Sequence, residues 1–264
     1  MLDDLVSAAL AAGASIMEIY GGPDFEARVK LDGSPVTAAD AAAEAIILSR
    51  LAVIAPDVPV VAEEACAEGR VPDTDALFFL VDPLDGTKEF LNRNGDFTVN
   101  IALVEHGQPV MGVVYAPAHG LIFTGQAGAG ARRAEVTGGV VGPWRAIAVR
   151  EAPAQGLDVV ASRSHLSDET REFIARFPVA DMVSAGSSLK FCRVAAGEAD
   201  LYPRLGRTME WDTAAGDAVV RAAGGFVRTM DGRPLIYGKR DQADDADFAN
   251  PWFVASGPFD PFLT

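Results

Sequence analysis

Hydrophobic residues recur three and four positions apart at the start of the chain. Over residues 2–20 they fall on one face of a helix, and the glycine pair that follows ends it. A short extended piece is expected over 25–31, with a turn at 32–35. A second amphipathic helix is predicted over 37–54, because the same spacing continues there until a proline follows.

From residue 58 the pattern changes to runs of β-branched and aromatic residues, separated by Gly, Pro and Asp. Such runs predict strands, and they cover residues 58–64, 77–82, 97–106, 108–117 and 120–126. Closely spaced strands with short turns favour a largely antiparallel sheet. We expect the two long helices that precede them to cover one face of this sheet.

Beyond the segment 138–145, which is rich in glycine, strand and helix patterns alternate. Strands are expected at 157–164, 180–187, 199–205 and 225–230, and helices at 168–177, 187–196 and 212–223. This order predicts a mixed sheet with helices on it. The chain therefore divides into an N-terminal α+β subdomain, 1–143, and a C-terminal α/β subdomain, 144–264. The acidic segment 241–253 is expected to be a surface loop before a last short strand.

Composition and charge narrow the possible partners. The chain has 264 residues, of which 49% are hydrophobic, so it can bury a substantial core. It carries 22 basic against 37 acidic residues, which argues against a nucleic-acid polymer as partner. No apolar stretch approaches the roughly 20 residues of a membrane helix, so no integral membrane association is expected.

The N-terminal residues are acidic where a secretion signal is basic, which favours a cytoplasmic location. Peripheral contact with the inner membrane stays open, although the net charge disfavours anionic lipid. Two distant cysteines and three scattered histidines form no disulfide framework or zinc motif. A monomer and a homodimer are both compatible with the pattern.

Six acidic residues lie at the ends of the expected elements. Carboxylates that gather in space resist ionisation unless a cation holds them, and Mg²⁺ prefers oxygen ligands. Asp82 and Asp85 are separated only by Pro83 and Leu84, so both can point to one spot beside the Leu84 carbonyl. Gly86 allows a tight turn, and its N–H with that of Thr87 can bind a phosphate. The six residues are Asp40, Glu63, Glu64, Asp82, Asp85 and Asp212.

Each of these residues also has an ordinary structural interpretation. A D-x-x-D-G segment is a common turn, and the glutamate pair after a strand is compatible with a solvated loop. Asp212 fits a helix N-cap, and Thr37 with Asp40 fits a capping box. An EF-hand does not fit, because Leu84 stands where that loop needs an Asp or Asn.

Longer motifs identify a family resemblance. "VDPLDGTKEF", with "VAEE" before it and "WDTAAGDAV" after it, resembles the inositol monophosphatase superfamily of Mg²⁺-dependent, lithium-sensitive phosphatases. "SPVTAAD", "RNGDFTVNIAL", "GVVYAP", "SRSH", "GSSLKFC" and "LYPRLG" resemble its CysQ-type 3′(2′),5′-bisphosphate nucleotidase branch. The resemblance implies a layered αβαβα sandwich with an antiparallel N-terminal sheet and a mixed C-terminal sheet. It also implies removal of the 3′-phosphate from adenosine 3′,5′-bisphosphate in sulfate assimilation, giving AMP.

The resemblance implies roles for single residues. Two Mg²⁺ ions are expected, one bound by Glu63, Asp82 and the Leu84 carbonyl, and one by Asp82, Asp85 and Asp212. Glu64 is expected to assist a third, weaker metal or its water shell. Asp40 and Thr87 are expected to orient a water. The substrate is expected to contact Glu63, Leu84, Asp85, Gly86, Thr87, Gly186, Ser187, Ser188, Lys190, Arg204 and Asp212.

Substrate choice is expected to depend on the second half of the chain. Inositol-type relatives tend to carry an acidic residue where this chain has Arg204, and a guanidinium suits a second phosphate. Lys190 lies near the start of a helix and can assist Arg204 in binding that phosphate. Both residues also fit a plain surface role. A broader phosphatase of inositol phosphates or fructose 1,6-bisphosphate is the alternative. A non-catalytic nucleotide or metal sensor is the remote one.

Overall fold

The structure is a computed structural model. The turn expected at 32–35 lies outside the described residues except for Pro35, and the motif "SRSH" lies outside them entirely. Next to that turn, β1 (Arg28–Val29) pairs with β2 (Pro35–Val36). The described residues are 1–23, 25, 28–29, 35–161 and 167–262.

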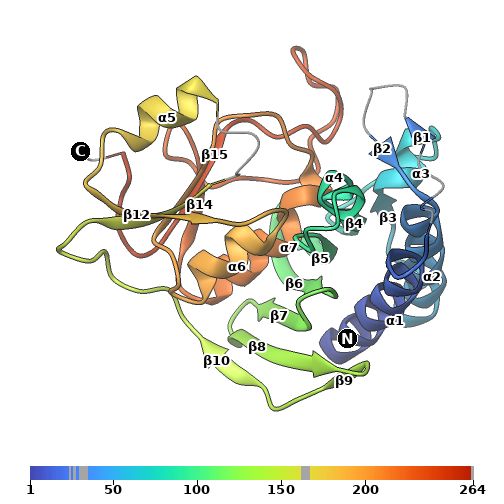
Figure 1. Cartoon of the computed structure of the whole chain (residues 1–264). Coiled ribbons are helices and arrows are strands. Elements are labelled where there is room, and N and C mark those ends of the chain that lie inside the picture. Colours follow the sequence, from blue (N-terminus) through green and yellow to red (C-terminus); the bar gives the residue numbers. More distant parts are fainter. Residues whose placement is uncertain (24, 26–27, 30–34, 162–166, 263–264) are drawn as a thin grey trace.

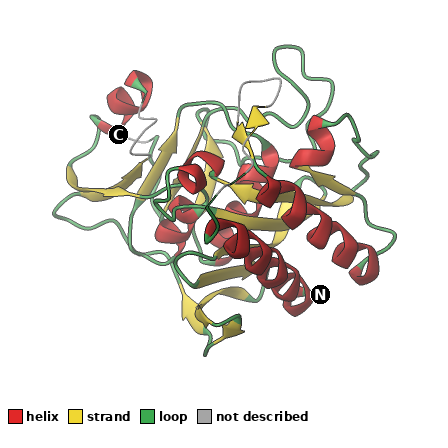
Figure 2. Ribbon diagram, turned by 45° about the vertical axis from the view of Figure 1, so that its right-hand side comes forward, coloured by secondary structure: helices red, strands yellow, loops and turns green. Residues whose placement is uncertain are grey.

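Two long helices form the outer layer of the N-terminal half, as predicted. Helices α1 (Leu2–Tyr20) and α2 (Ala38–Ile54) lie side by side in front of a sheet (Figure 2). Their apolar faces pack against this sheet around fully buried side chains such as Ile16, Ile47 and Phe79. Burial of this apolar surface, more than helix propensity, fixes both helices in place.

The first sheet is built mainly from consecutive antiparallel strands. Within this sheet, only β3 and β4 pair in parallel among the described strands. In spatial order the strands are β10 (Arg145–Ile147), β8 (Gly130–Thr137), β7 (Leu121–Gln126), β6 (Gln108–Ala116), β5 (Thr98–Glu105), β4 (Leu77–Asp85) and β3 (Val60–Ala62), with β9 (Val140–Val141) beside β8.

The sequence pattern did not reveal the last strands of this sheet. In β8 the buried positions are small or β-branched, but Arg132 and Arg133 interrupt the alternation on which strand prediction depends. β10 pairs with β8, so the first sheet extends past residue 143. The subdomain boundary expected there falls between β9 and β10.

The opposite face of the first sheet is covered by helices from the C-terminal half (Figure 1). These are α6 (Leu189–Ala195) and α7 (Glu210–Ala222), which lie between the two sheets. Helix α7 approaches the sheet closely because glycines face it. A Cβ atom on Gly112 would lie 2.5 Å from the Ala215 carbonyl oxygen. Glycine at this position is therefore a packing requirement.

The second sheet and α5 (Asp168–Ile174) complete the alternation of helix and sheet layers. The strands of this second sheet are, in order, β12 (Val179–Ser184), β11 (Leu157–Ala161), β13 (Leu201–Arg204), β15 (Phe253–Ser256) and β14 (Phe226–Thr229). Strand β11 pairs in parallel with both of its neighbours, whereas β15 pairs antiparallel with both of its own, so the sheet is mixed, as predicted.

The segment 241–253 is only partly the surface loop that was predicted. Phe248 is 2% exposed and Asn250 is 5% exposed. The Phe248 carbonyl accepts the Glu210 N–H at 2.8 Å, and Asn250 Nδ2 donates to the Met209 carbonyl at 2.7 Å. The prediction was wrong for this stretch, because contacts with the start of α7 bury it despite its acidic composition.

We predict that Gly112→Ala destabilises the protein. The added methyl group must push α7 away from the sheet, which should lower the free energy of unfolding by about 1–3 kcal/mol. Urea denaturation measures this change. Gly21→Ala is the matched control, because its Cβ would lie 3.5 Å from its nearest neighbour. Equal stability of the two variants would contradict the packing argument.

Candidate active site

The turn after β4 brings two carboxylates to the end of the first sheet. The register with β5 shifts between Asp82 and Asp85, where Pro83 cannot supply a ladder hydrogen bond. The Leu84 N–H donates to Asp82 Oδ1 at 3.0 Å. Gly86 has φ +92°, which permits the sharp entry into α4 (Thr87–Leu91).

Three carboxylates from different elements meet beside this turn. Glu63 of α3 (Glu63–Ala67), Asp82 of β4 and Asp212 of α7 each place an oxygen within 4.8 Å of the others. Ionised carboxylates this close repel one another, and because Asp82 is 1% exposed, water screens the repulsion poorly. All of these donors are oxygens, which is the set that hard divalent cations prefer. The cluster therefore fits a Mg²⁺ site.

Repulsion within this cluster shifts the ionisation of its members. Burial raises the pKa of Asp82 well above its usual value, and Glu63, Asp85 and Asp212 raise it further. Burial likewise raises the pKa of Asp212, with Asp85 and Glu63 adding to the shift. The folded protein therefore takes up protons here when no cation is bound.

The sequence predicted that Glu63 and Glu64 close a strand over residues 58–64. This prediction was wrong, because the pair begins a helix. Strand β3 ends at Ala62, and α3 starts at Glu63. The cause is Glu44, whose carboxylate accepts the N–H groups of Glu64 at 2.8 Å and Ala65 at 2.9 Å. Glu44 lies on α2 and was missed. Its signal was the four-residue spacing from Asp40 in an alanine-rich helix.

Asp40 caps helix α2 and also contacts Thr87. Its Oδ2 accepts the Thr37 N–H at 2.7 Å, which completes the predicted capping box at the start of α2. Its Oδ1 accepts from the Thr87 hydroxyl at 3.1 Å. The Leu84 carbonyl lies 3.4 Å from the same hydroxyl. Capping therefore orients Asp40 toward the turn that carries Thr87.

A cavity of about 140 Å³ joins the carboxylates to two basic residues. Lys190 is 6% exposed, and burial lowers its pKa to about 8. Its Nζ lies 5.6 Å from the centroid of the Tyr202 ring. Arg204 Nε is buried without a hydrogen-bond partner in the described part of the chain. The cavity is lined by Asp85, Gly86, Glu89, Ser187, Lys190, Phe191, Tyr202, Arg204, Thr208, Asp212 and Thr213.

The structure brings six of the eleven predicted substrate contacts into this cavity: Asp85, Gly86, Ser187, Lys190, Arg204 and Asp212. The other five do not line it: Glu63, Leu84, Thr87, Gly186 and Ser188. Ser188 Oγ donates to the Asp212 carbonyl at 2.8 Å, and the Gly186 N–H donates to Asp96 Oδ2 at 3.1 Å. The lining residues Tyr202, Thr208 and Thr213 were missed, because nothing local in the sequence sets them apart from core residues.

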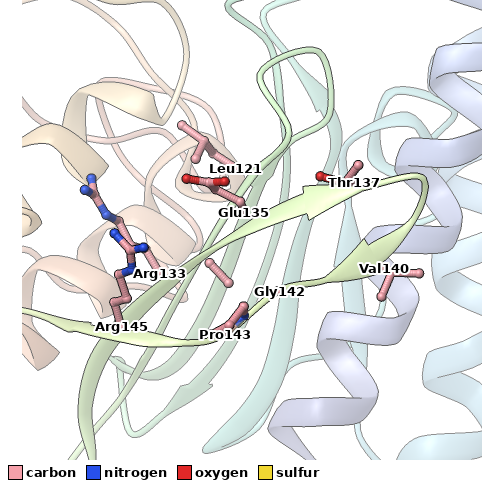
Figure 3. Close-up of a pocket in the computed structure, with 9 residues that line it drawn as sticks. Leu121, Arg133, Glu135, Thr137, Val140, Gly142, Pro143 and Arg145 are labelled. Carbon is pink, nitrogen blue, oxygen red and sulfur yellow. The ribbon is translucent and has the colours of Figure 1, made fainter.

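A larger hollow of about 600 Å³ lies elsewhere, at the β8–β10 edge of the first sheet (Figure 3). Within the described chain it shares no lining residue with the carboxylate cavity. Its Arg133 forms an ion pair with Glu198, and Glu135 is the only acidic residue among the described residues that line it. Size therefore does not identify the reactive site here, whereas the gathered carboxylates do.

Known proteins are similar to this chain in sequence and in fold. A family model described as the inositol monophosphatase family matches residues 1–252. The chain belongs to this family. It is 45% identical to the 3′(2′),5′-bisphosphate nucleotidase CysQ of Escherichia coli strain K12 and to that of Shigella flexneri. Each alignment covers 97% of this chain and 99% of the relative.

The crystal structure of CysQ from Bacteroides thetaiotaomicron, described as a bacterial member of the inositol monophosphatase family, has the same fold. It superimposes with a TM-score of 0.81 at 38% identity, covering 98% of this chain and 97% of the other. The layered sandwich expected from the sequence motifs is confirmed. No described helix is long and apolar enough to cross a membrane.

We predict that the stability of the metal-free protein falls as pH rises. The raised pKa values mean that the folded state keeps protons which unfolded aspartates release near pH 3.9. The free energy of unfolding in chelator should therefore decrease from about pH 4 upward, and Mg²⁺ should oppose the decrease. Asp82→Asn should flatten this profile, while the exposed control Asp75→Asn should not. Parallel profiles for the two variants would contradict this account.

Proposed function

We propose that this protein is a Mg²⁺-dependent phosphomonoesterase that hydrolyses the 3′-phosphate of adenosine 3′,5′-bisphosphate. The observation that carries the proposal is that acidic and basic residues line the same cavity. Asp85 and Asp212 line it together with Lys190 and Arg204. One phosphate can lie against cations held by the carboxylates, while the basic pair binds the other. The nucleotidase names of the 45% identical relatives support this substrate.

The proposed metal ligands follow the cluster described above. Glu63, Asp82 and the Leu84 carbonyl would hold one Mg²⁺, and Asp82 would share a second with Asp85 and Asp212. Glu64 would assist a third, weaker ion. When bound, Mg²⁺ supplies charge that neutralises the phosphate and makes water easier to deprotonate.

The side chains near the turn orient the reacting groups. Because the Thr87 hydroxyl donates its proton to Asp40, its oxygen remains an acceptor that can hold the attacking water. The N–H groups of Gly86 and Thr87 are proposed to bind the phosphate that is transferred. Water adds to phosphorus as the bond to the 3′ oxygen breaks, and that oxygen takes up a proton. The products are AMP and inorganic phosphate, and little covalent work falls to the protein.

Lys190 and Arg204 are proposed to select a doubly phosphorylated substrate. Arg204 Nη2 donates to the Arg207 carbonyl at 3.2 Å, while its buried Nε keeps an unused donor. Such a donor costs free energy until an anion accepts from it. Inositol 1-phosphate has no second phosphate to use it. Fructose 1,6-bisphosphate does, so this substrate belongs in the test.

The proposal is tested by phosphate release from adenosine 3′,5′-bisphosphate, inositol 1-phosphate and fructose 1,6-bisphosphate, each with Mg²⁺ and with chelator. We expect kcat/KM for the nucleotide to exceed the others by about tenfold or more, or about 1.4 kcal/mol. Comparable rates would replace the proposal with a broad sugar and nucleotide phosphatase. No release from any ester would favour a non-catalytic sensor.

We predict that Arg204→Gln acts through the second phosphate. The variant should lower kcat/KM for adenosine 3′,5′-bisphosphate by about 10- to 100-fold, the value of a hydrogen bond to a charged group. Turnover of adenosine 3′-phosphate should change by less than about threefold. Arg207→Gln is the matched control, because Arg207 pairs with Asp245 outside the cavity. Equal losses on both substrates would contradict the assigned role.

A pH prediction follows for Lys190. Its ammonium is charged below a pKa of about 8 and neutral above it. The ratio of kcat/KM for the bisphosphate to kcat/KM for adenosine 3′-phosphate should therefore fall as pH rises through about 8. Ionisations common to both substrates cancel in this ratio. Lys190→Met should make the ratio low and independent of pH, and a ratio that still fell in this variant would contradict the assignment.

A further inference from the structure

A row of polar residues at the start of strand β5 and just before it matches the turn before α6. Thr98 and Asn100 share one face of the strand, and Asp96 stands two positions before its first residue. In chain order, the three bond to Gly186, Ser187 and Ser188. The contacts are Asp96 Oδ2 with the Gly186 N–H at 3.1 Å, Thr98 Oγ1 with Ser187 Oγ at 2.5 Å, and Asn100 Nδ2 with Ser188 Oγ at 3.0 Å.

This row ends on two of the proposed metal ligands. Ser187 Oγ donates to Asp85 Oδ2 at 2.5 Å, and Ser188 Oγ donates to the Asp212 carbonyl at 2.8 Å. Asn100 Nδ2 also reaches Asp85 Oδ2 at 3.4 Å. The loop in the C-terminal half is thus bonded both to strand β5 and to the acidic residues.

Thr98 and Asn100 donate toward the turn, whereas Asp96 accepts from the Gly186 N–H. A carboxylate can only accept, so Ser187 must give its proton to Asp85 and must accept from Thr98. Thr98 Oγ1 lies 3.0 Å from Asn100 Oδ1 as well, and its one hydrogen serves both. Thr98 and Asn100 are both 0% exposed, so water cannot replace these bonds.

The turn needs this support, because its backbone is unfavourable without it. Ser187 has φ +52°, a left-handed conformation that a serine adopts at a cost. The turn is also tightly packed, since a Cβ on Gly186 would lie 2.6 Å from Asp96 Cβ. Loss of the Thr98 contact should let Ser187 relax and release its hydroxyl from Asp85.

We infer that Thr98 and Asn100 are positioning residues that hold Asp85 in its metal-binding orientation through the hydroxyl of Ser187 and through a direct amide contact. They touch neither substrate nor metal in this account. The inference rests on the proposed metal site. It assigns a role to the motifs "DFTVN" and "GSS", which lie 86 or more residues apart in the sequence and come into contact only in the folded protein.

The test is calorimetric titration of the substrate-free protein with Mg²⁺ alone. Thr98→Val should raise the Kd for Mg²⁺ about tenfold, the usual effect of losing a group that orients a metal ligand. Thr98→Ser, which restores the hydroxyl, should return the Kd to within about threefold of the original. Thr124→Val is the matched control, because it removes another buried hydroxyl from the same sheet, one that contacts Arg132.

A double-mutant cycle tests the route. If Thr98 acts through Ser187, adding Thr98→Val to Ser187→Ala should change the Kd by less than about half of its effect alone. Full additivity would overturn the route. If Thr98→Val does not fold, Asn100→Ala replaces it and should weaken Mg²⁺ binding in the same way. The melting temperature of Asn100→Ala without metal is the control that shows whether this variant is folded.

The outcomes separate this inference from the proposed function. A Thr98→Val protein that binds Mg²⁺ as tightly as the original would overturn the inference and leave the metal site standing. Equal weakening in Thr98→Val and Thr124→Val would also overturn it, because any buried hydroxyl would then matter. An original protein that binds no Mg²⁺ would overturn the proposed metal site itself.

Discussion

Mutual repulsion among three carboxylates, one buried and two half-buried, is the constraint around which this end of the molecule is organised. Glu63, Asp82 and Asp212 lie within 4.8 Å of one another, where ionisation of all three is costly without a cation. Each comes from a different element, so the fold must bring them together against their own repulsion. Apolar packing on both faces of the first sheet supplies the favourable free energy. The resulting site favours a bound cation, because the gathered carboxylates are unfavourable when no positive charge lies between them.

The short-range parts of this site could be predicted from the sequence. The capping box of Thr37 and Asp40, the turn at Asp82 and Asp85, and the need for glycine at position 86 all depend on neighbouring residues. Hydrophobic periodicity likewise predicted α1 and α2, whereas the order of layers was implied by the family resemblance. The capping box, the turn and the two helices are local features, so propensity and spacing contain them.

The parts that could not be predicted depend on residues far apart in sequence. Glu44 starts α3 from another helix, which turned an expected strand end into a helix. Phe248 is buried against the start of α7 although its neighbours are acidic. Thr98 meets Ser187 across 89 positions. A single sequence states the chemistry of each of these residues but not its partner, because only tertiary packing brings the pairs together.

The position of α7 between the two sheets has a consequence for synthesis of the chain. The helix comprises Glu210–Ala222, yet it covers a face of strands that are complete by Ile147. While the ribosome adds the intervening residues, that apolar face has no native cover. Partly made chains with exposed apolar surface are prone to aggregation, and contacts this distant in sequence form slowly. The emerging N-terminal half therefore exposes this apolar face until α6 and α7 dock on it.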